Sequence, residues 1–432
     1  MRKVIVLVTF CVFAKANLLE IKCDLNKAES CQTTEDERAR ESDKMVTEQI
    51  KQLFKNYNRK LRPHYIGKPV MVLVDATIIS FSNLDAIDMM YTIDMFFRQR
   101  WWDHRLAHNL SEPITIAIGT SHPSNIIWTP DTVFMNSVTS ALHHVIVENH
   151  KVDIYPNGTV FWGTRITVSP SCTLDLKAYP MDVQICGFEI VSYTYDSRHL
   201  KYDWYWKPGI EIKEENMLEF KLTDHKTIGE ERYFVAGNYT VLEGRFRFKR
   251  LMGFAITQVY LPSTAIVTVS WVSLWIKRTV IPARVSLCIT TVLTISTIWG
   301  NVNAQLPRVS YVKAIDVYLM TSFICIILTL LEYTIVLNIP DIMKKVRNNP
   351  LFRKRKMAKD TSNKIQLLPR AVNNEESLKE TEKKKEQKIQ QENIDICNRI
   401  EFLSRFFFPL AYTVFNIFYW SIYLKEDLKT LE

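Results

Sequence analysis

The stretch CTLDLKAYPMDVQIC, residues 172–186, begins and ends with cysteine and has thirteen residues in between. Tyr179, Pro180 and Asp182 lie inside it. Two cysteines of this kind are a candidate disulfide when the segment folds in an oxidising compartment. The rest of the chain therefore has to indicate on which side of a membrane this segment lies.

The N-terminus predicts secretion. Arg2 and Lys3 precede an apolar run, residues 4–13, and the small residues Ala14 and Ala16 follow it. This order is typical of a secretory signal peptide, which we place at residues 1–16. The alternative, an N-terminal membrane anchor, is disfavoured because the apolar run is too short to span a bilayer.

Secretion makes residues 17–252 an extracellular domain. Two cysteine pairs in it are candidate disulfides, Cys172 with Cys186 and Cys23 with Cys31, and it carries glycosylation sequons at Asn109, Asn157 and Asn238. Asn157 precedes a glycine, and this pair is also a hairpin-turn pattern, so that sequon fits turn chemistry equally well.

Short runs rich in Val, Ile, Thr and aromatic residues fill the region from Ile66 to Arg250. Alternation with a period of two is clearest at residues 70–79, 90–101, 159–168 and 244–250. Pro, Gly, Asn and Asp separate these runs, and no long helical pattern intervenes. We therefore predict an all-β, immunoglobulin-like antiparallel sandwich, preceded by one amphipathic helix at 42–57.

The composition changes after Gly253, where apolar segments begin. Four of them are long enough to span a bilayer as helices, at 254–276, 282–303, 315–339 and 406–424. We therefore predict an α-helical four-span bundle, with the first three spans inside residues 253–339.

The segment 340–405 between the third and fourth spans is charged and low in apolar residues, and we predict a largely disordered cytoplasmic loop. The signal peptide and the basic residues Lys277 and Arg278 give the same orientation. Both termini are then extracellular, and residues 425–432 form a short outer tail.

The second span carries a polar stripe. Ser286, Thr290, Leu293 and Thr297 are spaced by four, three and four residues, which places them on one helix face. Hydroxyl groups against lipid are costly, so we expect this face to meet protein or water. Several copies of the helix around an axis would line a pore with Leu293 as its apolar gate. Packing between helices, with Ser and Thr as hydrogen-bond partners, fits the same pattern.

The second span begins with Pro282, Ala283 and Arg284, and no acidic residue lies beside them in the sequence. We expect Arg284 to give the cytoplasmic mouth of such a pore a ring of positive potential. A ring of this sign favours anions.

Other function classes lack support. The nine histidines show no metal-ligand spacing, and neither a Gly-rich phosphate loop nor a nucleophile motif is present, so we predict a protein that is not an enzyme and needs no cofactor or metal.

The net charge of +9 is concentrated at 350–359 and 380–388. Following a membrane span, such segments meet anionic lipid, cytoplasmic partners or solvent instead of nucleic acid.

The stretch 172–186, with its cysteine spacing and its internal Tyr-Pro and Asp, resembles the signature loop of the Cys-loop pentameric ligand-gated channels. The resemblance covers nearly the whole chain, because WTPDTVF (128–134), RLMG (250–253), LPRVSYVKAIDVYL (306–319) and FPLAYTVFNIFYW (408–420) follow in the family's order. Pro282, Ala283 and Arg284 resemble the pore entrance of the anion-selective branch, which contains GABA, glycine and glutamate receptors.

This resemblance implies a homo- or hetero-pentamer of related subunits in a plasma membrane, neuronal or postsynaptic, in which an extracellular neurotransmitter opens an axial chloride pore. It also implies coupling roles. Tyr179 and Pro180 would press on the linker between the second and third spans, which ends near Lys313. Arg250 would pair with a nearby acidic residue, for which Asp182 and Asp85 are candidates. A disulfide that closes a loop this short contributes about 3 kcal/mol by chain-entropy estimates, and a purely stabilising role is compatible with it.

In the family the agonist binds between adjacent subunits. The matching residues of this chain are Tyr193, Phe234 and Tyr239 on one face and Phe96 and Arg98 on the other. Aromatic rings attract an ammonium group, and an arginine fork binds a carboxylate. For the aromatic residues a place in the sandwich core is the alternative, and for Arg98 a solvated strand face.

Several residues depart from the GABA-type pattern. Val191 replaces a glutamate, Ala236 a threonine, Val133 an aromatic residue and Gly163 a hydroxyl. GABA is still the leading expectation for the agonist. The alternatives are an anion channel gated by a biogenic amine or acetylcholine, and an accessory subunit that functions only in heteromers.

Overall fold

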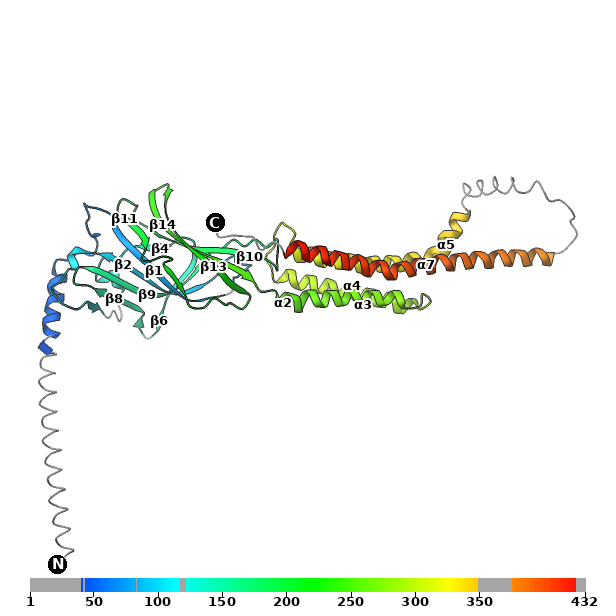
Figure 1. The fold of residues 1–432 in the computed structure, drawn as a ribbon, viewed down its shortest axis with the longest axis horizontal. Coiled ribbons are helices and arrows are strands. Elements are labelled where there is room, and N and C mark those ends of the chain that lie inside the picture. The colour runs from blue at the N-terminus through cyan, green and yellow to red at the C-terminus, as the bar shows by residue number, and fades with distance from the viewer. Residues whose placement is uncertain are drawn as a thin grey trace, which may run out of the picture.

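The computed structural model describes residues 40–41, 43–82, 84–116, 122–145, 147–348 and 375–424. The predicted signal peptide 1–16, the cysteines Cys23 and Cys31 and the predicted tail 425–432 lie outside the described residues. The described parts form a β-sandwich and a helical bundle that follow one another along the long axis of the molecule (Figure 1). A helix at 43–55 covers the end of the sandwich far from the bundle (Figure 1).

The alternating segments 70–79, 90–101, 159–168 and 244–250 form β1, β2, β9 and the end of β14, and further strands complete the sandwich. In chain order they are β1 Val70–Phe81, β2 Ile93–Trp102, β3 Ile114–Ile116, β4 Thr132–Phe134, β5 Ser137–Leu142, β6 His144–Val145, β7 Val147–Glu148, β8 His150–Ile154, β9 Thr159–Pro170, β10 Val183–Ser192, β11 Leu200–Trp204, β12 Ile210–Ile212, β13 Phe220–Phe234 and β14 Gly237–Arg250. Two short 3-10 helices, η1 His104–Leu106 and η2 Pro123–Asn125, interrupt them.

These strands form two main sheets. One contains, in spatial order, β11, β1, β2, β9, β8 and β3, with β12 beside β1 and β5 beside β9, and the other contains β13, β14, β10 and β4. The prediction of an antiparallel sandwich needs one correction, because β1 pairs in parallel with both β11 and β12. The residues of β11 and β12 arrive at this edge after the chain leaves the other sheet at the end of β10, and this crossover sets their direction.

The core lies between the two sheets. Phe81, from the first sheet, packs edge-on against Phe246 and Phe248 of the second, at ring-centroid distances of 5.1 and 5.3 Å. Successive side chains of a strand point to opposite faces, so each strand has a buried face and an outer face. On β9, for example, Trp162 and Thr164 are buried, whereas Gly163 between them faces outward.

The bundle contains the predicted spans with small changes at their ends. Its segments are α2 Gly253–Ala255, the π-helical turn η3 Ile256–Tyr260, α3 Leu261–Val272, the 3-10 turn η4 Ser273–Trp275, α4 Ile281–Ala304, α5 Ala314–Asn348 and α7 Glu375–Tyr423. By length and composition, three of the described helical segments could cross a membrane, namely Gly253–Trp275, Ile281–Ala304 and Ala314–Pro340.

The predicted fourth span, 406–424, forms the end of α7 and stays a prediction as a membrane span. This part of α7 is packed into the bundle by tyrosine hydroxyl groups. The Tyr419 hydroxyl lies 2.7 Å from that of Tyr260, and the Tyr412 hydroxyl lies 3.0 Å from that of Ser322. These contacts join α7 to the first and third spans.

The prediction of a largely disordered loop at 340–405 is wrong for the described residues of that segment. Helix α5 continues to Asn348, and α7 begins at Glu375, so both run beyond the ends of α3 and α4 (Figure 1). Cys397 of α7 is buried against Val336 and Ile339 of α5. An isolated charged helix would be marginal in water, and this apolar contact between two helices stabilises it.

A group of histidines is partly buried in the sandwich. His150 has a side chain that is 1% exposed, and its Nε2 lies 3.4 Å from Oε2 of Glu148. The ring of His122 lies 5.2 Å from the ring of His150, and Nδ1 of His144 lies 3.9 Å from Oε1 of Glu148. Burial lowers the pKa of both His122 and His150 below the ordinary value of 6.5, and the nearby Glu148 opposes this only in part.

We expect acid to destabilise the sandwich through these two rings. A histidine with a lowered pKa binds fewer protons when folded than when unfolded, so the stability it confers is complete above pH 6.5 and is lost as the pH falls below that value. Thermal unfolding of the full-length chain between pH 8 and pH 5 measures this effect.

The variant His150→Gln serves as the comparison, because glutamine is polar but does not titrate. Its melting temperature should fall less between pH 7 and pH 5 than that of the unchanged chain. Parallel pH profiles for the two proteins would contradict this expectation.

Candidate functional site

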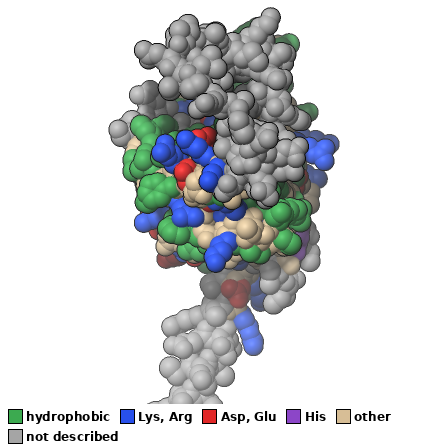
Figure 2. Space-filling model, turned by 90° about the vertical axis from the view of Figure 1, so that its right-hand side faces the viewer, with side chains coloured by type: hydrophobic (Ala, Val, Ile, Leu, Met, Phe, Trp, Pro, Cys, Tyr) green, Lys and Arg blue, Asp and Glu red, His purple; other side chains and the backbone are tan. Residues whose placement is uncertain are grey.

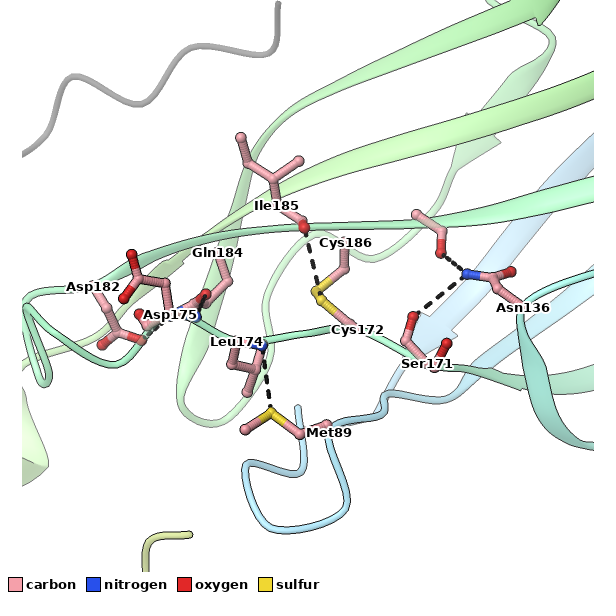
Figure 3. Close-up of a disulfide and its surroundings, with 11 residues drawn as sticks. Met89, Asn136, Ser171, Cys172, Leu174, Asp175, Asp182, Gln184, Ile185 and Cys186 are labelled. Atoms are coloured by element: carbon pink, nitrogen blue, oxygen red, sulfur yellow. Dashed lines mark hydrogen bonds between the residues drawn. A yellow bond between two sulfur atoms is a disulfide. The ribbon is translucent and has the colours of Figure 1, made fainter. Parts of the chain in front are cut away.

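The loop between the two cysteines is held in shape from several sides. Cys172 and Cys186 form the predicted disulfide (Figure 3). Inside the loop, Nε2 of Gln184 donates to the Asp175 carbonyl at 2.8 Å and to Oδ2 of Asp182 at 2.6 Å. The Leu174 backbone N–H points to the sulfur of Met89 on a neighbouring loop (Figure 3). This loop is therefore a fixed element of the domain.

The loop contacts the start of the third span. The carbonyl of Lys177 accepts a hydrogen bond from the Ala314 N–H at 2.8 Å, and the carbonyl of Tyr179 accepts one from the Ile315 N–H at 3.1 Å. Ala314 and Ile315 are the first residues of α5, whose N–H groups have no partner within the helix. The Leu176 N–H also donates to the Tyr311 hydroxyl at 3.0 Å. The extracellular loop thus caps a transmembrane helix.

Arg250 lies where β14 ends and the bundle begins, and its guanidinium is buried. Its Nε and Nη2 donate to the two carboxylate oxygens of Asp182 at 2.7 and 3.1 Å, which confirms the predicted pairing. Nη1 donates to Glu219 at 3.2 Å, a partner that the sequence motifs did not indicate. The other candidate, Asp85, instead accepts the N–H groups of Ile87 and Asp88 within its own turn.

Aromatic rings enclose this charged pair. The Arg250 guanidinium lies 4.8 Å from the ring centroid of Tyr179 and 4.2 Å from that of Phe220. Because such a pair is shielded from water, removing either partner leaves a buried charge without compensation. The Asp182–Arg250 pair therefore fixes the loop to the last residue of the sandwich.

Lys313 lies at the end of the linker between the second and third spans and is buried. Its Nζ forms an ion pair with Asp316 at 3.0 Å and donates to Asn303 of α4 at 3.1 Å. Trp299 of α4 donates to the same Asp316 at 3.1 Å. These contacts connect the start of α5, which the extracellular loop caps, to the outer end of the second span.

The predicted agonist residues of one face surround a hollow of about 460 Å³. Tyr193, Phe234 and Tyr239 line it together with Ala236, Val191 and Ser192 of β10, and apolar residues of β4. The rings of Phe234 and Tyr239 meet edge-to-face with centroids 5.7 Å apart, and Tyr193 is 79% exposed. These aromatic side chains are therefore available to a ligand and do not belong to the sandwich core.

The capping loop over this hollow is the tight turn between β13 and β14. Phe234 and Gly237 face each other across it, and Gly237 has a φ of +137°, a value that side chains rarely tolerate. The Ser197 N–H donates to the Asn238 carbonyl at 2.7 Å. Asn238 is exposed at this turn, and Asn109 and Asn157 are also exposed, so all three sequons are accessible for glycosylation.

The other predicted face lies on β2, in the first sheet. Phe96 and Arg98 share its outer face, and Phe96 is 40% exposed. Nε of Arg98 donates to Asp75 at 2.5 Å, and Nη2 donates to the Thr77 hydroxyl, which in turn donates to Glu211 at 2.9 Å. Arg98 is thus held by its neighbours and keeps 29% of its side chain exposed.

The chain does not bring these two faces together. Neither Phe96 nor Arg98 lines the hollow at Tyr193, because one face belongs to the sheet with β2 and the other to the sheet with β10, β13 and β14. A ligand that contacts both faces therefore needs the sandwiches of two chains side by side.

The polar stripe of the second span is uncovered. Ser286, Thr290, Leu293 and Thr297 of α4 are exposed, and Leu293 is 61% exposed, whereas Cys288 and Ile295 on the other side of the helix are buried by the same chain. The Thr290 and Thr297 hydroxyls donate to carbonyls one turn earlier, at 2.9 Å each. Of the three apolar spans, α4 is the least covered by its own chain.

The prediction for Arg284 is wrong. Its side chain is 1% exposed, so it does not line an inner mouth, and its Nη1 donates to Glu401 of α7 at 3.1 Å. Nε donates to the Ile276 carbonyl at 2.7 Å, and the guanidinium lies 5.0 Å from the ring centroid of Tyr333. The charge that was expected to attract anions is compensated by a carboxylate of the helix assigned to the disordered loop. Pro282 and Ala283 are exposed.

Charged side chains gather at the end of the bundle far from the sandwich. Figure 2 views the molecule from that end and shows Lys and Arg side chains, with a few acidic ones, between hydrophobic side chains on both flanks. In this region Arg278 donates to Asn398 of α7 at 2.8 Å. The distribution fits the rule that positive residues remain on the cytoplasmic side.

Comparison with known proteins agrees with this geometry. The model of the neurotransmitter-gated ion-channel ligand binding domain matches residues 46–252, and the model of the neurotransmitter-gated ion-channel transmembrane region matches residues 259–397. The chain belongs to the family of neurotransmitter-gated ion channels, which are multi-pass membrane proteins and not enzymes.

A relative in Gallus gallus, the gamma-aminobutyric acid receptor subunit beta-4, is 40% identical over 296 residues. The matched region is 68% of this chain and 60% of the relative, so the chain spans about three fifths of that protein's length. This similarity supports the anion-channel branch of the family.

The exposed stripe predicts accessibility to water. With Leu293→Cys in expressed channels, a charged methanethiosulfonate reagent should react about tenfold faster or more than with Ile295→Cys, because only a thiol in water ionises and meets such a reagent. Ile295 is the matched control, since it lies on the same helix but is 1% exposed. The unsubstituted chain gives the background from the native cysteines. Equal rates at both positions would show that the stripe does not face water.

Proposed function

We propose that this chain is a subunit of a pentameric plasma-membrane channel that an extracellular transmitter opens and that conducts chloride. The observation that carries the proposal is the uncovered polar stripe of α4, whose residues Ser286, Thr290, Leu293 and Thr297 are exposed and not covered by the chain's own bundle. A single helix cannot enclose a pore, but five copies around an axis enclose one with these residues as its lining. The two predicted agonist faces, at Tyr193 and at Arg98, lie on different sheets of one chain. A ligand that contacts both faces also needs neighbouring copies of the chain around an axis.

Anion selectivity follows from what lines the inner entrance. Residues 277–304, which include the linker and α4, contain no Asp or Glu. The N-terminus of α4 lies at this end, and a helix N-terminus carries a partial positive charge. In a pentamer five such helix ends would surround the entrance, and this arrangement replaces the ring of Arg284 side chains as the physical reason for attracting chloride.

GABA is the leading agonist. Arg98 is already fixed by Asp75 and Thr77, so little side-chain entropy is lost when its guanidinium binds a carboxylate. Phe96 lies beside it on the same strand face. The similarity to a gamma-aminobutyric acid receptor subunit supports the same choice.

A second candidate is a subunit that works only in heteromers. Among the described residues, the hollow at Tyr193 is lined by apolar and aromatic side chains and Ser192, and no acidic side chain among them could hold an amine. Val191 and Ala236 stand at its wall. In this case the chain supplies the face with Phe96 and Arg98, and a related subunit supplies the opposite face.

The orientation of the chain is part of the proposal. The sandwich and both termini are extracellular, and the parts of α5 and α7 beyond the spans are cytoplasmic. The expected location is a neuronal, postsynaptic membrane.

Expression in oocytes tests the function. GABA should open currents whose reversal potential follows the chloride gradient when external chloride is replaced. A reversal potential that follows sodium would contradict anion selectivity. Silence of the chain alone, with GABA currents after co-expression of a GABA receptor beta-type subunit, would favour the heteromer.

In either assembly, Arg98→Ala tests the agonist's carboxylate. It should raise the half-maximal GABA concentration about thirtyfold, since a hydrogen-bonded charge contact contributes about 2 kcal/mol. Arg247→Ala, on β14, is the control because it removes an arginine from the other sheet. An unchanged GABA concentration for Arg98→Ala would show that Arg98 does not hold the agonist's carboxylate.

A further inference from the structure

A second cavity, of about 450 Å³, lies inside the sandwich beneath β5. Its walls include Phe97 and Gln99 of β2, Thr132 and Phe134 of β4, and Trp162 and Thr164 of β9. Cavities of this volume, with mostly apolar walls and a few polar groups, are typical of small-molecule sites.

This cavity is separate from the face at Tyr193 but shares walls with both agonist faces. On β2, Phe97 and Gln99 point inward and alternate with Phe96 and Arg98, which point outward. On β4, Phe134 lines both hollows, while Val133 lines only the one at Tyr193. The Thr132 hydroxyl donates to Oε1 of Gln99 at 2.6 Å and so joins β4 to β2.

One polar group in the wall has no partner. The hydroxyl of Thr164 is buried and makes no hydrogen bond among the described residues, and the whole residue is only 7% exposed. A buried hydroxyl without a hydrogen bond costs about 1–3 kcal/mol, so such groups are normally satisfied by a ligand or water. Thr164 lines the cavity, so a molecule inside it can supply the missing bond.

The chemistry of the wall restricts the occupant. No Asp, Glu, Lys or Arg is among the described residues that line the cavity. His122 and His144 line it, and burial lowers the pKa of the His122 ring and favours its neutral form. Phe97, Phe134 and Trp162 offer ring faces and edges, which pack well against another aromatic ring. A charged molecule would lose its hydration without compensation here.

We propose that this cavity is a second ligand site, which takes a small uncharged aromatic molecule with one hydrogen-bonding group for Thr164. Because β2 and β4 carry the walls of both the cavity and the agonist faces, its occupation changes the sensitivity to agonist. The site lies within one chain and does not depend on which transmitter opens the channel.

Protection of an introduced cysteine from modification tests the site on the full-length chain at the cell surface. Ala141 of β5 lines the cavity and is exposed, so Ala141→Cys should react with a charged methanethiosulfonate reagent. Saturating indole, which is neutral and has one N–H donor, should slow this reaction about tenfold or more. Thr139→Cys is the matched control, because Thr139 is exposed on the same strand but is not part of the lining.

Two further comparisons test the chemistry. Adding Thr164→Val to Ala141→Cys should raise the indole concentration for half protection about threefold or more, because only the hydrogen bond is lost. Indole-5-carboxylate, which adds a charge to the same ring, should not protect. Equal reaction rates with and without indole, or equal protection at both cysteines, would overturn the site.

The coupling has its own readout. Indole should shift the half-maximal agonist concentration of a responding assembly, and Thr164→Val should reduce that shift. If indole protects the introduced cysteine but does not shift the half-maximal agonist concentration, the coupling is refuted and the binding site stands.

Discussion

The buried pair between Asp182 and Arg250 is the contact on which the relation of the two domains depends. Asp182 belongs to the loop closed by Cys172 and Cys186, and Arg250 is the last residue of the sandwich. With the loop fixed at this end, the carbonyls of Lys177 and Tyr179 reach the first N–H groups of α5. The sandwich thus supplies hydrogen bonds to the first turn of α5. A movement of the sandwich therefore acts directly on this helix end. From α5 the contact continues through Lys313 and Asp316 to α4.

Much of this arrangement could be predicted from the sequence because local signals agree with it. Alternating apolar residues mark β1, β2, β9 and β14, and the spacing and surroundings of Cys172 and Cys186 mark the disulfide. The pairing of Arg250 with Asp182 followed from a family motif and is confirmed. The parallel pairing of β1 with β11 was missed, since the direction of a strand depends on a crossover that no local pattern encodes.

The errors at Arg284 and at 340–405 have one cause. Low hydropathy marks the charged segment 340–405 as distinct from the membrane spans, which led to the prediction of a loop. In the structure α7 is one helix from Glu375 to Tyr423, and it packs against α5. Glu401 then reaches Arg284, and the expected ring of charge is absent from the described surface of α4. The acidic residue was visible in the sequence, but its contact with Arg284 is a long-range one that only tertiary structure creates.

A double-mutant cycle on the full-length chain shows whether the Asp182–Arg250 pair holds the signature loop against the bundle. Asp182→Asn and Arg250→Gln remove the charges singly and together, and thermal unfolding gives the change in stability for each. The double variant should lose less stability than the two single variants added together, with a coupling energy above about 1 kcal/mol. Losses that add up, within about 0.5 kcal/mol, would contradict it.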